Sequence, residues 1–410
     1  MFSKIPNSLL FLSSASAYPG VPHAGGVTIW NTLSTLAKSH VVSLVAFEKP
    51  DEISKREAIR ATIDRYITVP AFRGWLSRLI RLPLLLIMPL DLVSVLSLSF
   101  FLEFRRALRA APQAIVQAEY SSMGIYLWTV PSDTVTVLNL HDIQTDVLEQ
   151  AHRHANGLQR LILHTQKTLM GWWEKKTCQT VSMILVWSEK DREFVSTRWH
   201  IPTSKIHIFS PYVDFSMENI PPGDSDGRTL LFVGAMYREV NLEGCDWFLE
   251  NIWPLIKAKH PDAVFRIIGG NPPKQFVDRW RELKDVRIAG YVPDLSSEYR
   301  RATVVVVPLL RAGGIIVKML DALVAARPLV ATPAANSGIM AEDSAVRIAK
   351  DPHTFAEHVI KLLDSPKLCE ELGVRGREFV CRRYRWETTI RDLENAYAAA
   401  NERLSNPPGP

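Results

Sequence analysis

A cationic and an acidic side chain follow a pair of glycines in the stretch 303–332, and their spacing suits anion binding. Lys318 and Asp321 are three residues apart, so on a helix both lie on one side. Gly313 and Gly314 precede them, and glycines let backbone N–H groups approach an anion at a helix N-terminus. An acid one turn further in can accept hydrogen bonds from a ribose. Two interpretations stay open for this stretch alone, a nucleotide diphosphate site and an ordinary crossover with a glycine turn.

The elements that must hold these residues can be predicted from the flanking sequence. The run Val304–Val307 is β-branched throughout, which is typical of a strand buried on both faces, and Pro308 ends it. A helix begins near Lys318 and closes at Arg327, and residues 329–331 begin the next strand. Strand, loop, helix and strand in this order predict a crossover between parallel strands.

Glycines also follow the first predicted strand of the chain. Residues 9–13 have the pattern of a buried strand, 27–38 of a helix and 41–47 of a second strand. Gly25 and Gly26 end the loop between the first two. They lack the Gly-x-Gly-x-x-Gly spacing of dinucleotide sites, so they indicate either backbone approach to a ligand or a simple turn.

A histidine follows another predicted strand, residues 134–140. Because loops at the carboxyl ends of parallel strands collect ligand contacts, His141 is a candidate catalytic residue. The neighbouring Asp142 either orients the imidazole or caps the helix that follows.

Composition limits the classes of protein that remain. The 410 residues and 47% hydrophobic content allow two or three domains with full cores. A net charge of +5 without a basic block argues against a nucleic-acid partner. Four scattered cysteines fit a reducing, cytoplasmic setting and no zinc site. The apolar run at residues 9–12 is shorter than the roughly 7–15 residues of a signal-peptide core, which favours a strand there.

A turn-rich stretch at residues 211–228 divides the chain, and the alternation of strands and helices restarts after it. The two halves predict an α/β protein with two Rossmann-like, doubly wound parallel sheets facing across a cleft. We expect a first domain over 1–215 and a second over 216–385. A final helix over about 386–404 is expected to pack back on the first domain.

Residues 82–102 carry one charge, Asp91, over about the length of a membrane span, and arginines flank them. Three interpretations compete for this segment: buried or partly exposed helices, an interfacial segment on an anionic membrane, and a span. A span would place strands of one sheet on opposite sides of a bilayer. Helices are therefore favoured first, and peripheral contact with the inner face of the plasma membrane second.

Short glycine-containing motifs recur in a fixed order along the chain. They are Phe232-Val233-Gly234, Ile268-Gly269-Gly270, Gly290-Tyr291-Val292 and residues 308–332, with residues 10–13, 25–26, 137–142 and 188–191 in the first half. In the order of these motifs the chain resembles the GT-B glycosyltransferases, and among them the retaining group called glycosyltransferase family 4. The resemblance implies transfer of a sugar from a nucleotide-diphosphate sugar to a polysaccharide, glycan or lipid-linked acceptor.

The same resemblance implies a role for each candidate residue. Lys318 and Arg238 would neutralise the donor diphosphate without a metal or other cofactor, and Asp321 would bind ribose hydroxyls. His141 matches the histidine near the transferred sugar. The remaining donor-binding positions are Gly25, Gly26, Gly234, Gly270, Val292, Gly313, Gly314 and Ile315.

The chain departs from the family pattern at the acidic pair Glu-x7-Glu. Its second member is Asp321 and its first falls on Gly313, while Ile316 stands where an arginine is common. Two alternatives therefore stay open. One is a nucleotide-sugar 2-epimerase with Glu119 and Asp142 as acid and base, and the other is an inactive homologue that acts as a binding or assembly subunit.

Overall fold

The computed structural model describes residues 7–21, 23–71, 84, 87–111 and 115–405. It divides into two compact units. Unit 1 comprises Met1–Tyr212 with Trp386–Pro410, and unit 2 comprises Val213–Arg385. The first division thus falls at 212/213, where the sequence predicted 215/216.

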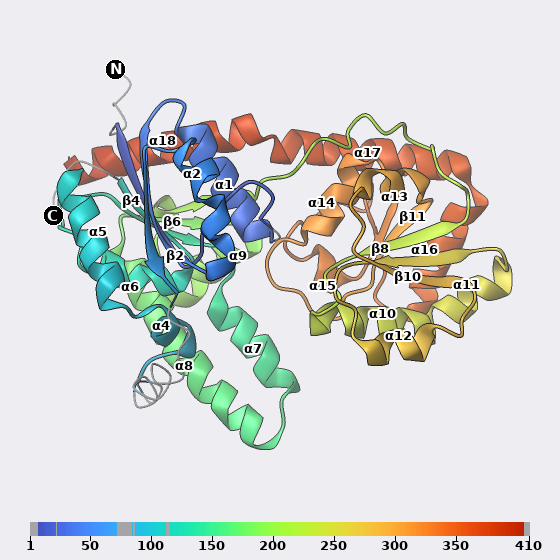
Figure 1. Ribbon diagram of the computed structural model, residues 1–410. Helices are drawn as coiled ribbons and strands as arrows, with labels where there is room; N and C mark the ends of the chain where they lie inside the picture. The colour runs from blue at the N-terminus through green and yellow to red at the C-terminus, as the bar shows by residue number, and fades with distance from the viewer. Residues whose placement is uncertain (1–6, 22, 72–83, 85–86, 112–114, 406–410) are drawn as a thin grey trace. The chain divides into compact units, whose positions relative to one another are not determined.

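Unit 1 is built on a seven-stranded sheet in which every adjacent pair of strands is parallel, in the order β3-β2-β1-β4-β5-β6-β7 (Figure 1). The strands are β1 Ser8–Ser13, β2 Val41–Glu48, β3 Arg65–Pro70, β4 Ile115–Glu119, β5 Thr136–Leu140, β6 Met183–Val186 and β7 Ile206–Ile208. β1, β4 and β5 are buried almost throughout because both faces of the sheet are covered.

Helices cover the two faces of this sheet. They are α1 Ala24–Leu36, α2 Arg56–Arg60, α4 Leu90–Val95, α5 Leu98–Ala110, α6 Gly124–Leu127, α7 Gln144–His154, α8 Gly157–Thr180, α9 Glu189–Trp199 and α18 Trp386–Ser405. One core cluster joins the sheet to α5, α6 and α9, and a second joins it to α1 and α18. Helices α7 and α8 form a hairpin that extends away from the sheet, as Figure 1 shows.

The glycine pair near the N-terminus lies in a helix and not in the predicted loop. Helix α1 begins at Ala24, so Gly25 and Gly26 form part of its first turn. His23 caps this turn, since its Nδ1 accepts a hydrogen bond of 2.9 Å from Gly26 N. The predicted start at Val27 was wrong because this side-chain cap extends the helix through two residues of low helix propensity.

The apolar segment 82–102 contains two short helices, α4 and α5, where it is described; residues 82–83 and 85–86 lie outside the described part. Over the described residues, no helix is long and apolar enough to cross a membrane. Leu90 N donates to Gln166 Oε1 over 2.8 Å, which places the start of α4 beside α8. In α8, Trp173 is buried, whereas the neighbouring Trp172 is 62% exposed.

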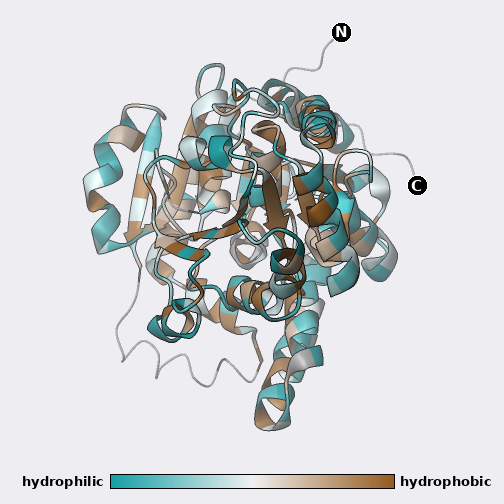
Figure 2. Ribbon diagram, turned by 90° about the vertical axis from the view of Figure 1, so that its right-hand side faces the viewer, coloured by the Kyte–Doolittle hydropathy of each residue, from teal (hydrophilic) through white to brown (hydrophobic). Residues whose placement is uncertain are grey.

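Unit 2 has a six-stranded parallel sheet in the order β10-β9-β8-β11-β12-β13. The strands are β8 Thr229–Val233, β9 Val264–Ile268, β10 Val286–Gly290, β11 Val304–Val307, β12 Leu329–Ala331 and β13 Arg347–Ile348. The helices are α10 Glu239–Asn251, α11 Trp253–Lys259, α12 Lys274–Trp280, α13 Leu295–Arg301, α14 Val317–Val324, α15 Pro333–Asn336, α16 Pro352–Asp364 and α17 Pro366–Tyr384. In both units hydrophobic residues gather in the strands, and hydrophilic residues on the outer helices (Figure 2). Two doubly wound parallel sheets were predicted, and both are confirmed.

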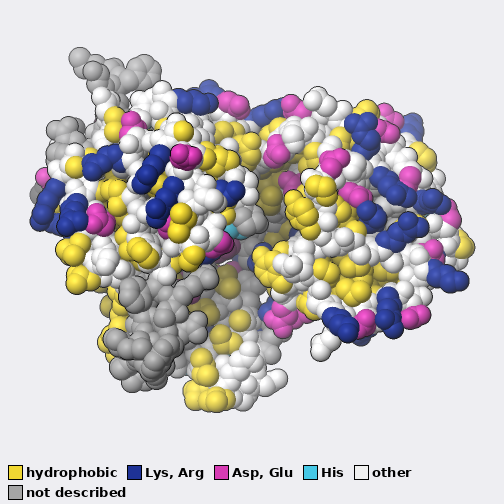
Figure 3. Space-filling model, viewed as in Figure 1, with side chains coloured by type: hydrophobic (Ala, Val, Ile, Leu, Met, Phe, Trp, Pro, Cys, Tyr) yellow, Lys and Arg dark blue, Asp and Glu magenta, His cyan; other side chains and the backbone are white. Residues whose placement is uncertain are grey.

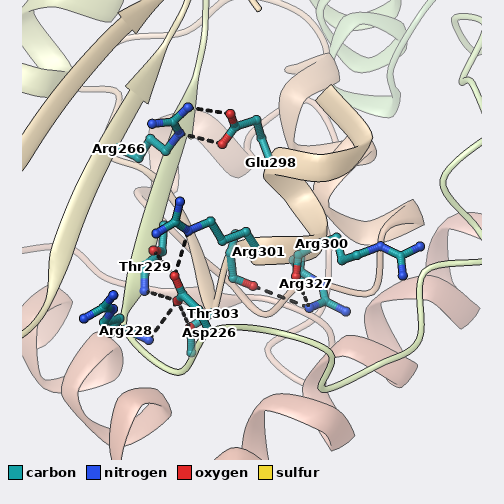
Figure 4. A network of polar contacts seen from close by, with 10 residues as sticks. Asp226, Arg228, Thr229, Arg266, Glu298, Arg300, Arg301, Thr303 and Arg327 are labelled. Carbon is teal, nitrogen blue, oxygen red and sulfur yellow. Dashed lines mark hydrogen bonds and ion pairs between the residues drawn. The ribbon is translucent and has the colours of Figure 1, made fainter. Parts of the chain in front are cut away.

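A polar network ties the turn-rich stretch 211–228 to the start of this second sheet (Figure 4). Asp226 accepts hydrogen bonds from Thr229 N, Thr229 Oγ1 and Arg301 Nε at 2.6–2.9 Å. The buried Arg327 donates to backbone carbonyls, among them those of Pro221 and Asp224 at 2.5 and 2.7 Å. The network lies at the amino ends of β8 and β11, so the carboxyl ends of these strands are left for the candidate site.

Candidate functional site

The side chain of Lys318 is held in the first turn of α14. Its Nζ donates to Asn241 Oδ1 over 2.7 Å and lies 4.2 Å from the centroid of the Phe232 ring. The pKa of Lys318 is lowered to about 7, chiefly by burial and to a smaller extent by the nearby charge of Arg238. Because neither Asn241 nor the Phe232 ring carries a negative charge, the ammonium group held by them can still bind an anion.

Glycines allow the loops after β8 and β9 to approach this lysine. A Cβ added at Gly234 would lie 2.5 Å from Lys318 Nζ, and one at Gly269 would collide with the carbonyl oxygen of Gly234. The β8 loop is fixed by Asn241, whose Nδ2 donates to Ala235 O over 2.8 Å. It is also fixed by Gly270, whose carbonyl accepts from Met236 N over 3.1 Å. The structure therefore brings Gly234, Gly270 and Lys318 to one edge of the sheet.

Asp321 lies one helical turn beyond Lys318 on α14. The half-buried carboxyl has its pKa raised to about 7, chiefly by burial and also by the charge of Asp214. A carboxyl that is largely desolvated can hydrogen-bond hydroxyl groups in either protonation state. Asp321 therefore lies one turn beyond the cation, on the helix where the ribose contact was predicted.

The other predicted donor-binding residues of unit 2 differ in where they lie and in how far they are buried. Gly313 and Gly314 precede α14, and Gly314 has a φ of +59° that favours glycine. Ile315 is buried, whereas Val292 is half-buried in the loop after β10. Arg238 is exposed at the N-terminus of α10 and has no ion-pair partner among the described residues. Its influence on the pKa of Lys318 shows that the two cations lie within electrostatic reach of each other.

In unit 1 the predicted histidine is part of a buried cluster at the ends of β4 and β5. His141 Nε2 lies 2.6 Å from Glu119 Oε2, and the two side chains are 4% and 1% exposed. Asn139 Nδ2 donates to the same carboxylate oxygen over 2.9 Å. The ring of His141 stacks against Tyr120 at 4.1 Å and is tilted at 4.5 Å from Trp187.

Of the two interpretations left open for Asp142, the first, that it orients His141, is wrong. Glu119 occupies Nε2, and Nδ1 is buried without a hydrogen-bond partner. Asp142 is also not the cap of the next helix, because the N-cap of α7 is Ile143. The reason is the register of the sheet: β4 and β5 pair with Glu119 opposite Asn139, and this places Glu119 beside the residue that follows the strand.

Tyr120 is a site residue that the sequence did not reveal. Its φ of +71° lies in the region that favours glycine, and a bulky residue there is strained by about 1–3 kcal/mol. A Cβ added at Gly25 would collide with Tyr120 Oη and lie 3.1 Å from His141 Nδ1. Gly25 is therefore required by close packing against the histidine. A Cβ added at Gly26 would lie 2.8 Å from the side chains of His23 and Val21, so glycine at this position leaves room for the capping histidine. Within the described residues, no group of three or more His, Cys, Asp or Glu side chains could hold a metal ion.

Part of the second unit is similar to a known family, and one curated protein is a distant relative. Residues 227–365 match the family model described as glycosyl transferases group 1. A relative from Klebsiella pneumoniae, an uncharacterized 44.6 kDa protein in the cps region, is 23% identical over 261 residues. The match covers 60% of this chain and 64% of that protein, so it spans less than two thirds of the relative's length.

Two solved structures resemble nearly the whole chain. Sucrose-phosphate synthase from Thermosynechococcus elongatus has a TM-score of 0.71 at 15% identity and covers 96% of this chain and 98% of its own. Anabaena HepE in complex with UDP has a TM-score of 0.67 at 10% identity and covers 96% and 100%. The GT-B fold and the resemblance to GT-B glycosyltransferases are thereby confirmed, while membership of family 4 stays a prediction.

Proposed function

We propose that this GT-B protein is a glycosyltransferase that moves a sugar from a nucleotide-diphosphate sugar to a polysaccharide, glycan or lipid-linked acceptor. The observation that carries the proposal is the half-desolvated Lys318 at the start of α14, with Asp321 one turn further along. Both lie in the region that matches glycosyl transferases group 1. Negative charge develops on the leaving diphosphate in the transition state, and a fixed cation stabilises it most there.

The proposed reaction is retaining and independent of a metal. Lys318 and Arg238 supply the positive charge that a metal would otherwise supply to the diphosphate, and Asp321 binds the ribose. The donor phosphate assists deprotonation of the acceptor, and His141 acts near the transferred sugar. The positions of Lys318 and Asp321 support this assignment, and the absence of an acid at Gly313 leaves the identity of the sugar open.

The comparisons suggest which substrates to test first. The Anabaena structure contains UDP, and the Klebsiella relative is a product of the cps region. We therefore propose a uridine-diphosphate sugar as donor and a surface polysaccharide or its lipid-linked precursor as acceptor.

A binding and turnover screen tests the function. UDP should bind the full-length protein in calorimetry, and a UDP-sugar should be consumed only when an acceptor is present. If the sugar is isomerised without an acceptor, the 2-epimerase is the better description. If neither UDP nor another nucleoside diphosphate binds, the protein is an inactive homologue that serves as a binding or assembly subunit.

Peripheral binding to an anionic membrane is a further part of the proposal. Exposed apolar side chains form a stripe on one side of α8. They lie at positions three, four and fourteen residues after the first: Leu158, Leu161, Ile162 and Trp172. Hydrophobic side chains gather at the end of the α7–α8 hairpin in Figure 3. From residue 150 to 173 the sequence has three Arg or Lys and no Asp or Glu. This surface suits an anionic lipid bilayer better than a second copy of itself, since a twofold contact would oppose like charges.

A further inference from the structure

We infer that Glu119 is a positioning residue that holds His141 with its proton on Nε2, so that Nδ1 is free to accept a hydrogen bond from a substrate hydroxyl. The inference rests on the proposed function, because it names what the histidine of that site recognises. Glu119 itself contacts no substrate in this assignment and acts only through the imidazole.

The hydrogen bonds around Glu119 determine the direction of its contact with the histidine. Gln117 Nε2 donates to Oε1 over 2.6 Å, and Asn139 Nδ2 donates to Oε2 over 2.9 Å. A carboxylate can only accept hydrogen bonds. Because the Glu119 side chain is only 1% exposed, no water molecule takes the place of these two amide donors. The short contact of 2.6 Å to His141 Nε2 is consequently an N–H donated by the ring.

Gln117 is oriented by a residue from the far end of the chain. Tyr397 Oη of α18 donates to Gln117 Oε1 over 2.5 Å, so the amide oxygen faces the tyrosine. The NH₂ group of Gln117 must then face Glu119. This chain of bonds opposes the reversed arrangement, in which a protonated Glu119 carboxyl would donate its O–H to Nε2 and leave the proton of the imidazole on Nδ1.

The second ring nitrogen lacks the partner that its burial requires. Nδ1 of His141 is buried and unbonded, which costs about 1–3 kcal/mol relative to a satisfied acceptor. It faces the Cα of Gly25, where no Cβ intervenes, and the ring is held between Tyr120 and Trp187. With Nε2 protonated, Nδ1 of the neutral ring carries a lone pair, so the group that it selects is a hydrogen-bond donor such as a sugar hydroxyl. Because this nitrogen is buried, the proposal requires that the first turn of α1 or the ring of Tyr120 moves to admit the hydroxyl.

The first experiment determines directly which ring nitrogen of His141 is protonated, and it needs no substrate. ¹⁵N–¹H spectra of the free, full-length protein with labelled histidine should show His141 protonated on Nε2, assigned by comparison with the His141→Gln variant. In Glu119→Gln the proton should move to Nδ1 or divide between the nitrogens. The matched control is Glu174→Gln. Glu174 is equally buried but bonds to Gln144 N and Thr145, so its substitution should leave the His141 signals unchanged.

The second experiment tests whether the position of the His141 proton affects turnover. Glu119→Gln should lower kcat at least tenfold and change its pH profile, with the Kd for UDP within twofold of the parent. Glu174→Gln should stay within twofold in kcat. If Glu119→Gln folds poorly, Glu119→Asp keeps the carboxylate and should retain the Nε2–H form with part of the activity.

The outcomes separate this inference from the proposed function. A parent protein protonated on Nδ1, or a Glu119→Gln variant with normal kcat and pH profile, overturns the role of Glu119. A protein that transfers no sugar but is protonated on Nε2 refutes the proposed function and leaves the positioning of His141 by Glu119 intact.

Discussion

Lys318 Nζ donates to Asn241 Oδ1 over 2.7 Å, and this bond joins the start of α14 to α10. It holds the ammonium group beside the loop glycine Gly234. Replacing Lys318 by Ala should cost about 3 kcal/mol of transition-state stabilisation, or a kcat/KM lower by roughly two orders of magnitude. The control is Lys361→Ala, because Lys361 is an exposed lysine on α16 of the same unit, and this substitution should leave kcat/KM unchanged. Unchanged donor turnover in Lys318→Ala would remove the lysine from the mechanism.

Binding of UDP should depend on pH through Lys318. Its pKa of about 7 means that the free protein carries this charge below pH 7 and loses it above. Because the diphosphate binds the charged form, the apparent Kd should rise between pH 7 and 9, by up to about tenfold per unit. Binding should also be accompanied by proton uptake, which calorimetry in buffers of different ionisation enthalpy detects.

Asp321 gains charge over the same pH range, so its contribution must be separated. In Asp321→Asn the rise in Kd should persist, whereas in Lys318→Arg, which stays protonated, it should flatten. A Kd for the parent that is flat or falls between pH 7 and 9 contradicts the assignment to Lys318.

Asp321→Asn should stabilise the protein at alkaline pH. The folded pKa of about 7 lies above the unfolded value of 3.8, so the native state binds the proton more tightly. The free energy of unfolding therefore falls as the pH rises from about 4 to 7 and stays lowered above. Removing the carboxylate should add about 2 kcal/mol at pH 8, which is less than the full shift implies because the group is half-buried. At pH 4 the free energy of unfolding of the variant should be close to that of the parent. Denaturant unfolding at pH 4 and pH 8 measures the difference.

Gly25→Ala should impair activity more than folding. The new methyl group collides with Tyr120 Oη and crowds His141 Nδ1, while α1 itself tolerates alanine. We expect kcat to fall at least tenfold with a small change in the melting temperature and in UDP affinity. Gly171→Ala is the matched control on α8, where a Cβ would make an ordinary 3.4 Å contact with Thr145. Equal effects from both substitutions would rule out the crowding of His141 as the cause.

The stripe on α8 predicts salt-sensitive binding to vesicles. The full-length protein should float with vesicles that contain anionic lipid at low ionic strength, and less so at high ionic strength. Leu158→Glu with Ile162→Glu should abolish flotation, since both side chains are more than half exposed on one face of the helix. Val374→Glu, an exposed apolar position in unit 2, is the control. Absence of binding by the parent at low salt refutes the membrane surface.

The strands could be predicted because their signal is local. The run Val304–Val307 became β11 with the predicted bounds, and the predicted strand 9–13 became β1, which begins one residue earlier. Both runs are dominated by apolar residues that a strand buried on both faces requires. The partner of His141 could not be predicted, because Glu119 precedes it by 22 residues and meets it only through the pairing of β4 with β5. The strained backbone of Tyr120 likewise leaves no trace in residue type.

The bond from Tyr397 to Gln117 has a consequence for the order in which the molecule is completed during synthesis. Helix α18 contributes Ile390, Leu393 and Tyr397 to the core of unit 1, although all of unit 2 is translated before it. Until α18 emerges from the ribosome, the first sheet has one face covered only in part, and Gln117 lacks its tyrosine. The imidazole acquires its fixed orientation only when the last helix docks, so a chain interrupted before residue 386 should bind nucleotide without being able to turn over.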